Sequence, residues 1–204
     1  MTEDAISGAT TLAAAWELPL SYESSARLGL YASKLLEWNR RVNLTGARDL
    51  HELLDAHLPD SFALAKLCPA RATVVDVGSG GGLPAIPFAI LRPDCHVTLV
   101  EPRAKRVAFL NMALRTCDCR LARVVRARAE NMPSSGFSVA TSRATFGTES
   151  WLRIASRLLS TGGMAVVFAA RPTVTASAAA VLRRSVDYHT SSGVPRWAGL
   201  FVFM

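Results

Sequence analysis

The residues best suited to chemistry lie in a glycine-dense segment that follows an apolar run. The run 74–77 contains one acid, Asp76, and leads into four glycines within positions 78–82. Glycines let the backbone turn sharply and approach a ligand where any Cβ would collide. A dinucleotide site needs G-x-G-x-x-G, but counting from Gly78 places Leu83 at the third glycine. No Lys-Ser or Lys-Thr pair follows the turn, so a phosphate-binding loop is not indicated.

A second acid favours a ligand that carries no phosphates. The run 97–101 is typical of a strand and ends in Glu101, about 20 residues after the glycines, where a carboxylate would bind a pair of ribose hydroxyls. Asp76 and the amides of the turn around Gly78 and Gly80 suit an amino-acid moiety. S-adenosylmethionine contains both groups, and we expect it to be the ligand. The alternatives are that Glu101 only caps the next helix and that the turn is a plain strand-to-helix connection.

The pattern beyond residue 69 predicts the sheet that would position these side chains. Short β-branched runs alternate with helical segments, which is typical of stacked βα units and a parallel sheet. We expect strands at residues 73–77, 97–101, 122–125, 137–142, 164–169 and 199–204. We expect helices at residues 83–91, 103–115, 148–159 and 174–184. The expected fold is therefore α/β and Rossmann-like.

Helical patterns dominate the first third of the chain. Residues 1–20 are small and polar, and we expect a weakly ordered arm or a short helix there. Apolar residues recur at helical spacing over 23–38, and shorter helices are expected at 50–58 and 61–67. We therefore expect an N-terminal arm and helical cap at 1–68 and a Rossmann-like domain at 69–204, together forming a single structural unit.

The charge balance favours a phosphate-rich partner. The 204 residues carry a formal net charge of +7, and all but three of the 23 basic residues are arginines, which suit bidentate phosphate contacts. An arginine-rich genomic base composition explains that bias equally well. The four cysteines include a C-x-C but no paired C-x-x-C units, so no metal is expected. No apolar run reaches the roughly 18 residues of a membrane span and no basic leader is present, so we expect a cytoplasmic location without membrane contact.

Six short motifs follow one another between about residues 27 and 170. They are W-N-R-R-V-N-L-T from Trp38, H-L-P-D-S from His57, D-V-G-S-G-G-G-L-P-A-I-P from Asp76, K-R-V-A-F-L from Lys105, R-A-E from Arg128 and S-R-A from Ser142. In combination they resemble the bacterial small-subunit ribosomal RNA guanine-N7 methyltransferases, the RsmG or GidB family. The resemblance implies a class I S-adenosylmethionine-dependent methyltransferase with a mainly parallel seven-stranded sheet and helices on both faces.

The resemblance also implies roles for individual residues. Cofactor contacts are implied at Gly78, Leu83, Ala129, Glu130 and Arg143, with Glu101 at the usual ribose position. Arg143 would hold the cofactor carboxylate or an RNA phosphate, and a structural salt bridge is its alternative. Asn43, His57 and Asp60 would shape the roof of the site from the cap, with a non-catalytic role favoured for His57. Guanine N7 carries a free lone pair, so Arg143 and Asn43 would act by positioning and no general base is expected.

Arginines near the crevice would hold the RNA. The candidates are Arg40, Arg41, Arg48, Arg103, Arg106 and Arg171. A second cluster comprises Arg115, Arg120, Arg123, Arg126 and Arg128, for which a solvated edge of the sheet is an equally good interpretation. The expected partner is 16S ribosomal RNA or the small ribosomal subunit, and the protein is expected to be a monomer.

Three features depart from the family pattern, one of them being that the sequence ends at Phe203-Met204 without the family's customary basic tail. Family members read L-K-G after the fifth strand, where this chain has Phe168-Ala169-Ala170-Arg171, and Ala85 stands in place of a turn glycine. If that lysine contacts RNA, either Arg171 replaces it or the activity has changed. Two alternatives therefore stay open. One is an S-adenosylmethionine-binding protein of the same fold with a changed RNA substrate or lost activity. The other is a nucleotide-cofactor oxidoreductase, against which the missing third glycine argues.

Overall fold

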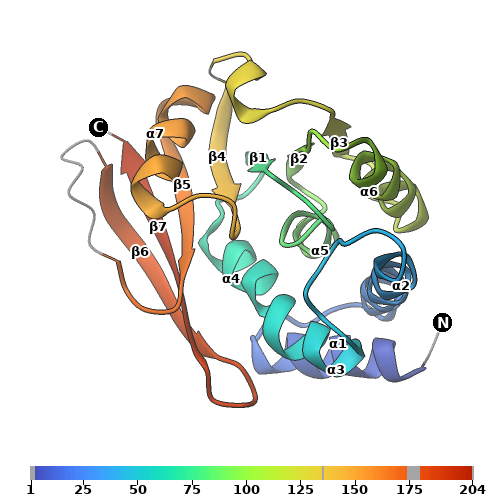
Figure 1. Ribbon diagram of the computed structural model, residues 1–204. Coiled ribbons are helices and arrows are strands. Elements are labelled where there is room, and N and C mark those ends of the chain that lie inside the picture. The colour runs from blue at the N-terminus through green and yellow to red at the C-terminus, as the bar shows by residue number, and fades with distance from the viewer. Residues whose placement is uncertain (1–2, 135, 174–179, 204) are drawn as a thin grey trace.

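A seven-stranded sheet organises the computed structural model, which describes residues 3–134, 136–173 and 180–203. The strands are β1 (Thr73–Val77), β2 (His96–Val100), β3 (Ala122–Val125), β4 (Phe137–Ser142), β5 (Leu159–Ala169), β6 (Ala180–His189) and β7 (Pro195–Phe203). Their order is β3-β2-β1-β4-β5-β7-β6, parallel from β3 to β5 (Figure 1). β7 runs antiparallel to β5 and β6. The strand order reverses between β1 and β4, and open α/β sheets bind ligands outside the carboxyl ends of the strands at such a point.

Helices cover both faces of this sheet. α1 (Glu3–Ala15), α2 (Tyr22–Asn39), α3 (Leu50–Glu52), the π-helical turn η1 (Leu53–His57) and α4 (Pro59–Leu67) precede β1. The crossovers contain α5 (Ala85–Leu91), α6 (Ala104–Thr116), the 3-10 turn η2 (Ala129–Asn131) and α7 (Thr148–Leu158). Side chains of β1 alternate between the faces, so Val74 packs in the core that includes α2, α4, α5 and α6, whereas Val75 packs in the core that includes α7.

The mainly parallel seven-stranded sheet with helices on both faces, which the resemblance implies, is confirmed. The sequence pattern alone predicts six of these strands and misses β6. β1, β3 and β4 have the expected bounds, and β2 begins and ends one residue earlier than expected. The N-terminal region, where a weakly ordered arm or a short helix was expected, forms α1, which buries Ala5, Ala9 and Ala13 along one face at helical spacing. The helix expected at 50–58 is divided into α3 and η1.

One predicted element is wrong. The alanine-rich stretch 174–184 was expected to be a helix, but residues 180–184 begin β6, and residues 174–179 lie outside the described residues. β6 pairs with β7 from Ala180 opposite Phe203 to His189 opposite Pro195. Long-range pairing therefore overrides the local helix propensity, which is a weak preference.

Candidate functional site

The glycine turn connects β1 to α5 at the carboxyl end of the sheet. The amide of Gly78 donates to the carbonyl of Val100 at 2.9 Å, so the end of β2 fixes the start of the turn. Gly78 and Gly80 have φ angles of +75° and +57°, in the left-handed region that favours glycine. A Cβ on Gly81 would stand 2.8 Å from the carbonyl oxygen of Leu44. The glycine at that position therefore lets the loop after α2 lie directly against the turn.

Glu101 follows β2 directly, and its carboxylate binds the glycine turn. Oε2 accepts a hydrogen bond from the amide of Gly80 at 3.0 Å, and Oε1 accepts one from the amide of Arg103 at 2.9 Å. Nη1 of Arg106 lies 3.9 Å from Oε2, and Glu101 is only 2% exposed. Carboxylate oxygens accept more than one hydrogen bond each, so this group keeps capacity for ribose hydroxyls. The capping alternative is also visible, because Arg103 is the N-cap of α6.

Asp76 is a buried acid that lacks a full set of hydrogen bonds. It is 1% exposed, and its Oδ2 has no hydrogen-bond partner among the described residues. Burial raises the pKa of Asp76 to about 7, against the opposing charge of Arg143. Thr141, which pairs with Asp76 across β1 and β4, likewise has a buried Oγ1 without a described partner. Unpaired polar atoms in the interior are costly, and those that persist commonly mark functional sites.

Arg143 follows β4 and reaches across to the helical cap. Its Nη1 donates to Oδ2 of Asp60 at 3.0 Å and lies 3.4 Å from both the carbonyl oxygen and Nδ1 of His57. Oδ1 of Asp60 accepts from the hydroxyl of Tyr188 at 2.6 Å. Burial, together with the charge of Arg143, lowers the pKa of His57 and so favours the neutral form of its ring. The salt bridge considered for Arg143 is thus present, and it joins β4, the cap and β6.

The loop after α2 is shaped by Asn39, which sequence reasoning passed over. Its Oδ1 accepts from the amides of Leu44 at 2.8 Å and Thr45 at 3.0 Å. Its Nδ2 donates back to the carbonyls of Thr45 and Ala47 at 3.0 and 3.3 Å. Asn43, by contrast, is exposed. Its backbone carbonyl accepts a hydrogen bond from Nη2 of Arg106 at 2.8 Å. The signal was available, because Asn39 lies in the same motif as Asn43.

Two tyrosines were also missed because their contacts join distant parts of the chain. The hydroxyl of Tyr31, on α2, donates to the carbonyl of Gly81 at 2.7 Å and so ties the cap to the glycine turn. Tyr188, on β6, holds Asp60 as described above, and it packs edge to face against Trp16. No local pattern in the sequence indicates either contact.

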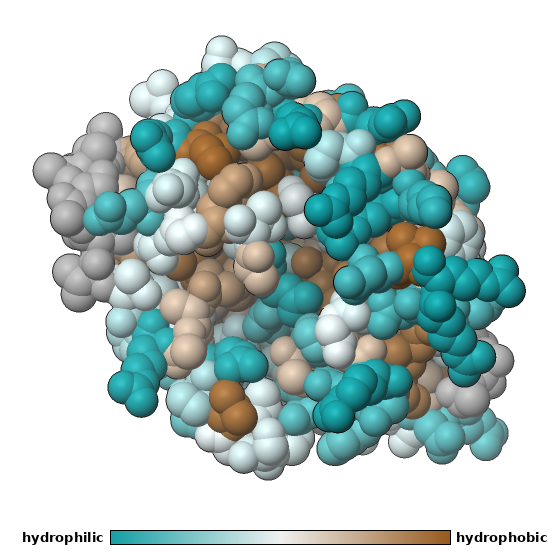
Figure 2. All heavy atoms as spheres, viewed as in Figure 1, coloured by the Kyte–Doolittle hydropathy of each residue, from teal (hydrophilic) through white to brown (hydrophobic). Residues whose placement is uncertain are grey.

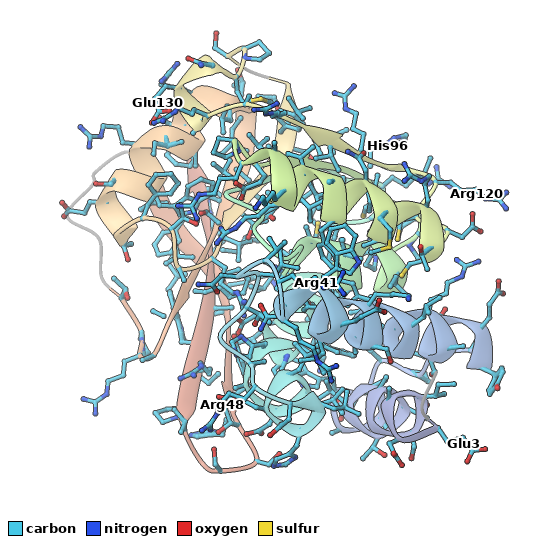
Figure 3. All side chains as sticks on the ribbon, turned by 45° about the vertical axis from the view of Figure 1, so that its right-hand side comes forward. Glu3, Arg41, Arg48, His96, Arg120 and Glu130 are labelled. Carbon is cyan, nitrogen blue, oxygen red and sulfur yellow. The ribbon has the colours of Figure 1, made fainter. Side chains whose placement is uncertain are left out.

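The other predicted cofactor residues lie at the same edge of the sheet. Leu83 is buried just before α5, and Ala129 is buried in η2, beyond the end of β3. Glu130 is exposed and stands out from this edge in Figure 3. The structure thus brings Asp76, the glycine turn and Glu101 into direct proximity, whereas Glu130 belongs to the rim.

The predicted RNA-binding arginines lie at the surface, but they are spread out. Arg40, Arg41, Arg48, Arg103 and Arg171 are exposed, and Arg106 is half-buried. Figure 3 shows Arg41 where α2 meets α6 and Arg48 well apart from it, where Arg48 forms an ion pair with Glu52 at 3.0 Å. On the face seen in Figure 2, hydrophilic residues gather on the right-hand side, over the region of α2 and α6.

Clustered metal ligands and membrane-spanning helices are absent from the described ranges. Within 3–134, 136–173 and 180–203, no group of three or more His, Cys, Asp or Glu side chains is placed to hold a metal ion. The four cysteines are unpaired, and burial raises the pKa of Cys117 to about 12 and that of Cys119 to about 11. In the same ranges, no helix is both long and apolar enough to cross a membrane.

Comparisons of sequence assign the chain to one group of enzymes. Residues 24–190 match the family described as GidB, rRNA small subunit methyltransferase G. A relative from Anaeromyxobacter dehalogenans (strain 2CP-C), named ribosomal RNA small subunit methyltransferase G, is 40% identical over 150 residues, covering 72% of this chain and 69% of the relative. A relative of the same name from Neisseria meningitidis (strain Z2491) is 37% identical over 150 residues, covering 74% and 72%.

Solved structures share the fold at low sequence identity. A SAM-dependent methyltransferase from Aquifex aeolicus has a TM-score of 0.60 at 12% identity, covering 85% of this chain and 98% of that structure. A putative O-methyltransferase from Klebsiella pneumoniae has a TM-score of 0.58 at 14% identity, covering 85% and 90%. At such identities the likeness concerns the fold alone.

Proposed function

The chain belongs to the rRNA small subunit methyltransferase G family, and on that basis we propose that it transfers a methyl group from S-adenosylmethionine to N7 of a guanine in 16S ribosomal RNA. Its relatives are named as enzymes of small-subunit rRNA methylation; the guanine N7 atom follows from the motif resemblance. One observation supports the site in particular: two buried acids, Asp76 and Glu101, meet at one glycine turn outside the carboxyl ends of β1 and β2.

The residues present fit S-adenosylmethionine. The unpaired Oδ2 of Asp76 and Oγ1 of Thr141 are buried acceptors that suit the amino-acid moiety together with the turn amides. Glu101 retains acceptor capacity for ribose hydroxyls, and Leu83 and Ala129 offer apolar contacts to the base. We propose Asp76, Gly78, Gly80, Leu83, Glu101, Ala129, Glu130 and Arg143 as the cofactor site. When bound, the cofactor supplies a methyl group on an electrophilic sulfonium.

The protein contributes to the reaction mainly by positioning the two reactants. N7 of guanine needs no deprotonation before attack, so holding the two reactants in line supplies most of the rate increase that this reaction requires. Arg143 suits this task because Asp60 and His57 fix its Nη1, leaving its other N–H groups for a carboxylate or a phosphate. Asn43 is proposed to act beside it, from the loop that Asn39 shapes. We further propose that the RNA is held by Arg40, Arg41, Arg48, Arg103, Arg106 and Arg171.

The direct test is methyl transfer to defined RNA. Small ribosomal subunits from cells that lack this gene are incubated with the protein and tritiated S-adenosylmethionine, and the label is mapped by nuclease digestion and mass spectrometry. One N7-methylguanosine in 16S RNA is the expected product. Label at another atom or on another RNA would refute the proposal. Tight cofactor binding without any label would identify a non-catalytic binding protein instead. A bacterial cytoplasmic location and a monomeric state belong to the same proposal.

A further inference from the structure

One segment carries nearly all of the chain's net charge. Residues 102–134 contain eight arginines and lysines against two acids, so this segment contributes +6 to the formal net charge of +7. The segment covers α6, β3 and η2, and the rest of the chain is close to neutral. An arginine-rich genome would spread the excess evenly along the chain. A charge gathered on one side instead creates a local field that attracts polyanions.

Five exposed arginines of this segment lie on the edge strand β3 or on the residues that precede and follow it, and are here called the β3 stripe. They are Arg115, Arg120, Arg123, Arg126 and Arg128. β3 is an outermost strand of the sheet, so one of its edges is unpaired by any other described strand. The four residues of β3 (Ala122–Val125) span about 13 Å at roughly 3.3 Å per residue, and Arg120, Arg126 and Arg128 lie in the segments that flank the strand. The stripe therefore runs from the end of α6 toward the carboxyl edge of the sheet.

The arginines along β3 are held in place through Nε. Nε of Arg123 donates to Oγ1 of Thr98 at 3.2 Å, and Nε of Arg126 donates to the carbonyl of Pro102 at 3.4 Å. Because Nε makes these contacts, the terminal Nη groups stay available for other acceptors. Pro102 adjoins Glu101, so Arg126 brings the stripe to the proposed cofactor site.

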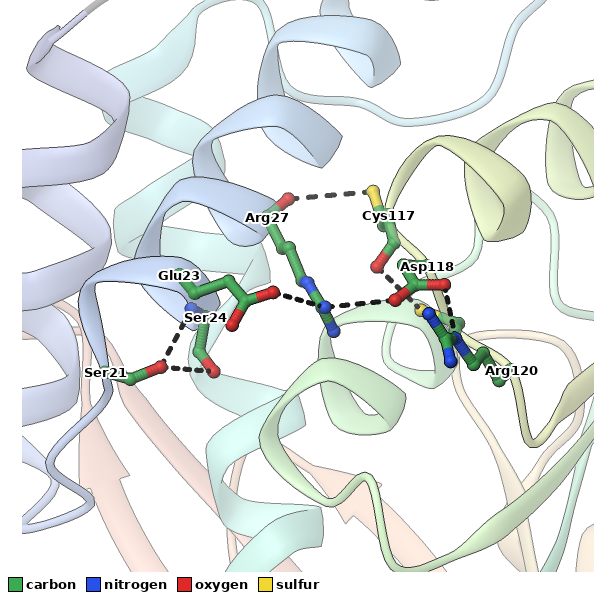
Figure 4. A network of polar contacts seen from close by, with 8 residues as sticks. Ser21, Glu23, Ser24, Arg27, Cys117, Asp118 and Arg120 are labelled. Carbon is green, nitrogen blue, oxygen red and sulfur yellow. Dashed lines mark hydrogen bonds and ion pairs between the residues drawn. The ribbon is translucent and has the colours of Figure 1, made fainter.

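The start of the stripe is braced by α2. Nε of Arg120 contacts Oδ1 of Asp118 at 2.8 Å, and Oδ2 of Asp118 contacts Arg27 at 3.1 Å. Arg27 also contacts Glu23 at 2.7 Å, and its backbone carbonyl accepts from the thiol of Cys117 (Figure 4). These contacts fix the turn between α6 and β3. They orient Arg120, whose side chain stays 82% exposed.

The surface around β3 is hollowed on both sides. A hollow of about 700 Å³ is lined by residues that include His96, Arg120 and Arg123. A second hollow, of about 480 Å³, is lined by residues that include Arg115, Arg120 and Arg123. Arg120 and Arg123 thus form a ridge between two hollows, and Figure 3 shows His96 and Arg120 projecting from the same edge. A ridge of guanidinium groups flanked by hollows suits a ribose-phosphate chain.

A merely solvated edge accounts less well for these features. A single charge or a proline is enough to protect an edge strand from pairing with another chain. Of the five arginines, only Arg120 forms an ion pair with a described residue. Like charges gathered at one edge disfavour the compact state through self-repulsion, and a bound polyanion would relieve it.

We propose that the β3 stripe binds the phosphate backbone of the RNA substrate, along the stretch that flanks the methylated guanine. The inference rests on the proposed function, because it takes RNA to be the substrate. It assigns the strand-edge arginines to RNA affinity and leaves the methyl-transfer step to the residues at the carboxyl edge.

The test compares two double variants. Arg115→Gln with Arg123→Gln removes two charges from the β3 stripe, and Arg153→Gln with Arg157→Gln removes two exposed charges from α7 as the control. Figure 1 shows α7 and β3 at opposite sides of the molecule. The measurements are KM and kcat for RNA methylation, filter binding of protein-free 16S RNA and of small subunits at several salt concentrations, and cofactor affinity by calorimetry.

In the stripe variant the KM and Kd for RNA should rise about tenfold at ~0.15 M salt, and the slope of log K against log salt should become shallower by about 1.5. Its kcat and cofactor affinity should match the wild type. The inference fails if RNA binding changes no more than in the α7 control. It also fails if only small subunits are affected, since an acidic ribosomal protein would then be the partner. If wild-type protein methylates no RNA, the proposed function fails, and the filter-binding data still decide on the stripe.

Discussion

Asp76→Asn should stabilise the ligand-free protein while weakening its hold on the cofactor. The pKa of Asp76 is raised to about 7 by burial, against an ordinary value of 3.8. Between these values the folded state keeps a proton that the unfolded state has released, so the free energy of unfolding falls as the pH rises through this window. Three pKa units correspond to about 4 kcal/mol, lost progressively from about pH 4 to pH 7. Asparagine does not titrate, so the variant should lack this loss.

The assay is urea unfolding of wild type and variant at pH 5 and pH 8. The stability difference in favour of the variant should grow by about 2–3 kcal/mol between the two pH values, because about 1.6 kcal/mol is already lost at pH 5. Asp187→Asn, which changes an exposed acid, serves as the control and should show no such growth. Calorimetry should show at least tenfold weaker cofactor binding, as expected when a charged acceptor is lost. Parallel pH profiles of wild type and variant would refute the reasoning.

Two further substitutions test other contacts of the site. Glu101→Gln replaces a carboxylate that accepts two backbone hydrogen bonds, and calorimetry should show cofactor binding weakened by about 1–3 kcal/mol. Glu149→Gln changes an exposed acid and should leave the cofactor affinity unchanged. Equal cofactor affinities in the two variants would mean that the cofactor lies elsewhere. Asn39→Ala removes the four contacts that shape the loop after α2, and thermal unfolding should show a loss of about 2–3 kcal/mol. Asn43→Ala, on an exposed neighbour, should cost under about 0.5 kcal/mol, and a similar loss in both would show that Asn39 has no special part.

Much of the fold could be predicted because its signals are local. The apolar run 74–77 before a glycine turn predicts β1 from its own composition, and the same reasoning gives β3 and β4 their observed bounds. β6 could not be predicted this way, since its alanine-rich start favours a helix and only its pairing with β7 makes it a strand. α1 shows a neglected signal, because its buried alanines recur every four residues.

The same distinction between local and long-range signals decides which residues of the site could be predicted. Glu101 was found because a carboxylate at a fixed distance after a glycine turn is a sequential pattern, and its contact with Gly80 follows from neighbouring parallel strands. The contact between Tyr188 and Asp60 joins residues 128 positions apart, and no spacing rule connects them. Asn39 lay within a recognised motif, yet its role became clear only from the four backbone groups that it bonds.

The strand order has a consequence for how the protein is made. β7 is synthesised after β6, yet it lies between β5 and β6 in the sheet. A nascent chain that stops before residue 195 therefore has no place in the sheet for β6, and Tyr188 cannot be seated against Asp60. Arg143 receives its complete support only when translation has passed the final hairpin. The contacts that support Arg143 are therefore incomplete until nearly all of this sequence has been synthesised.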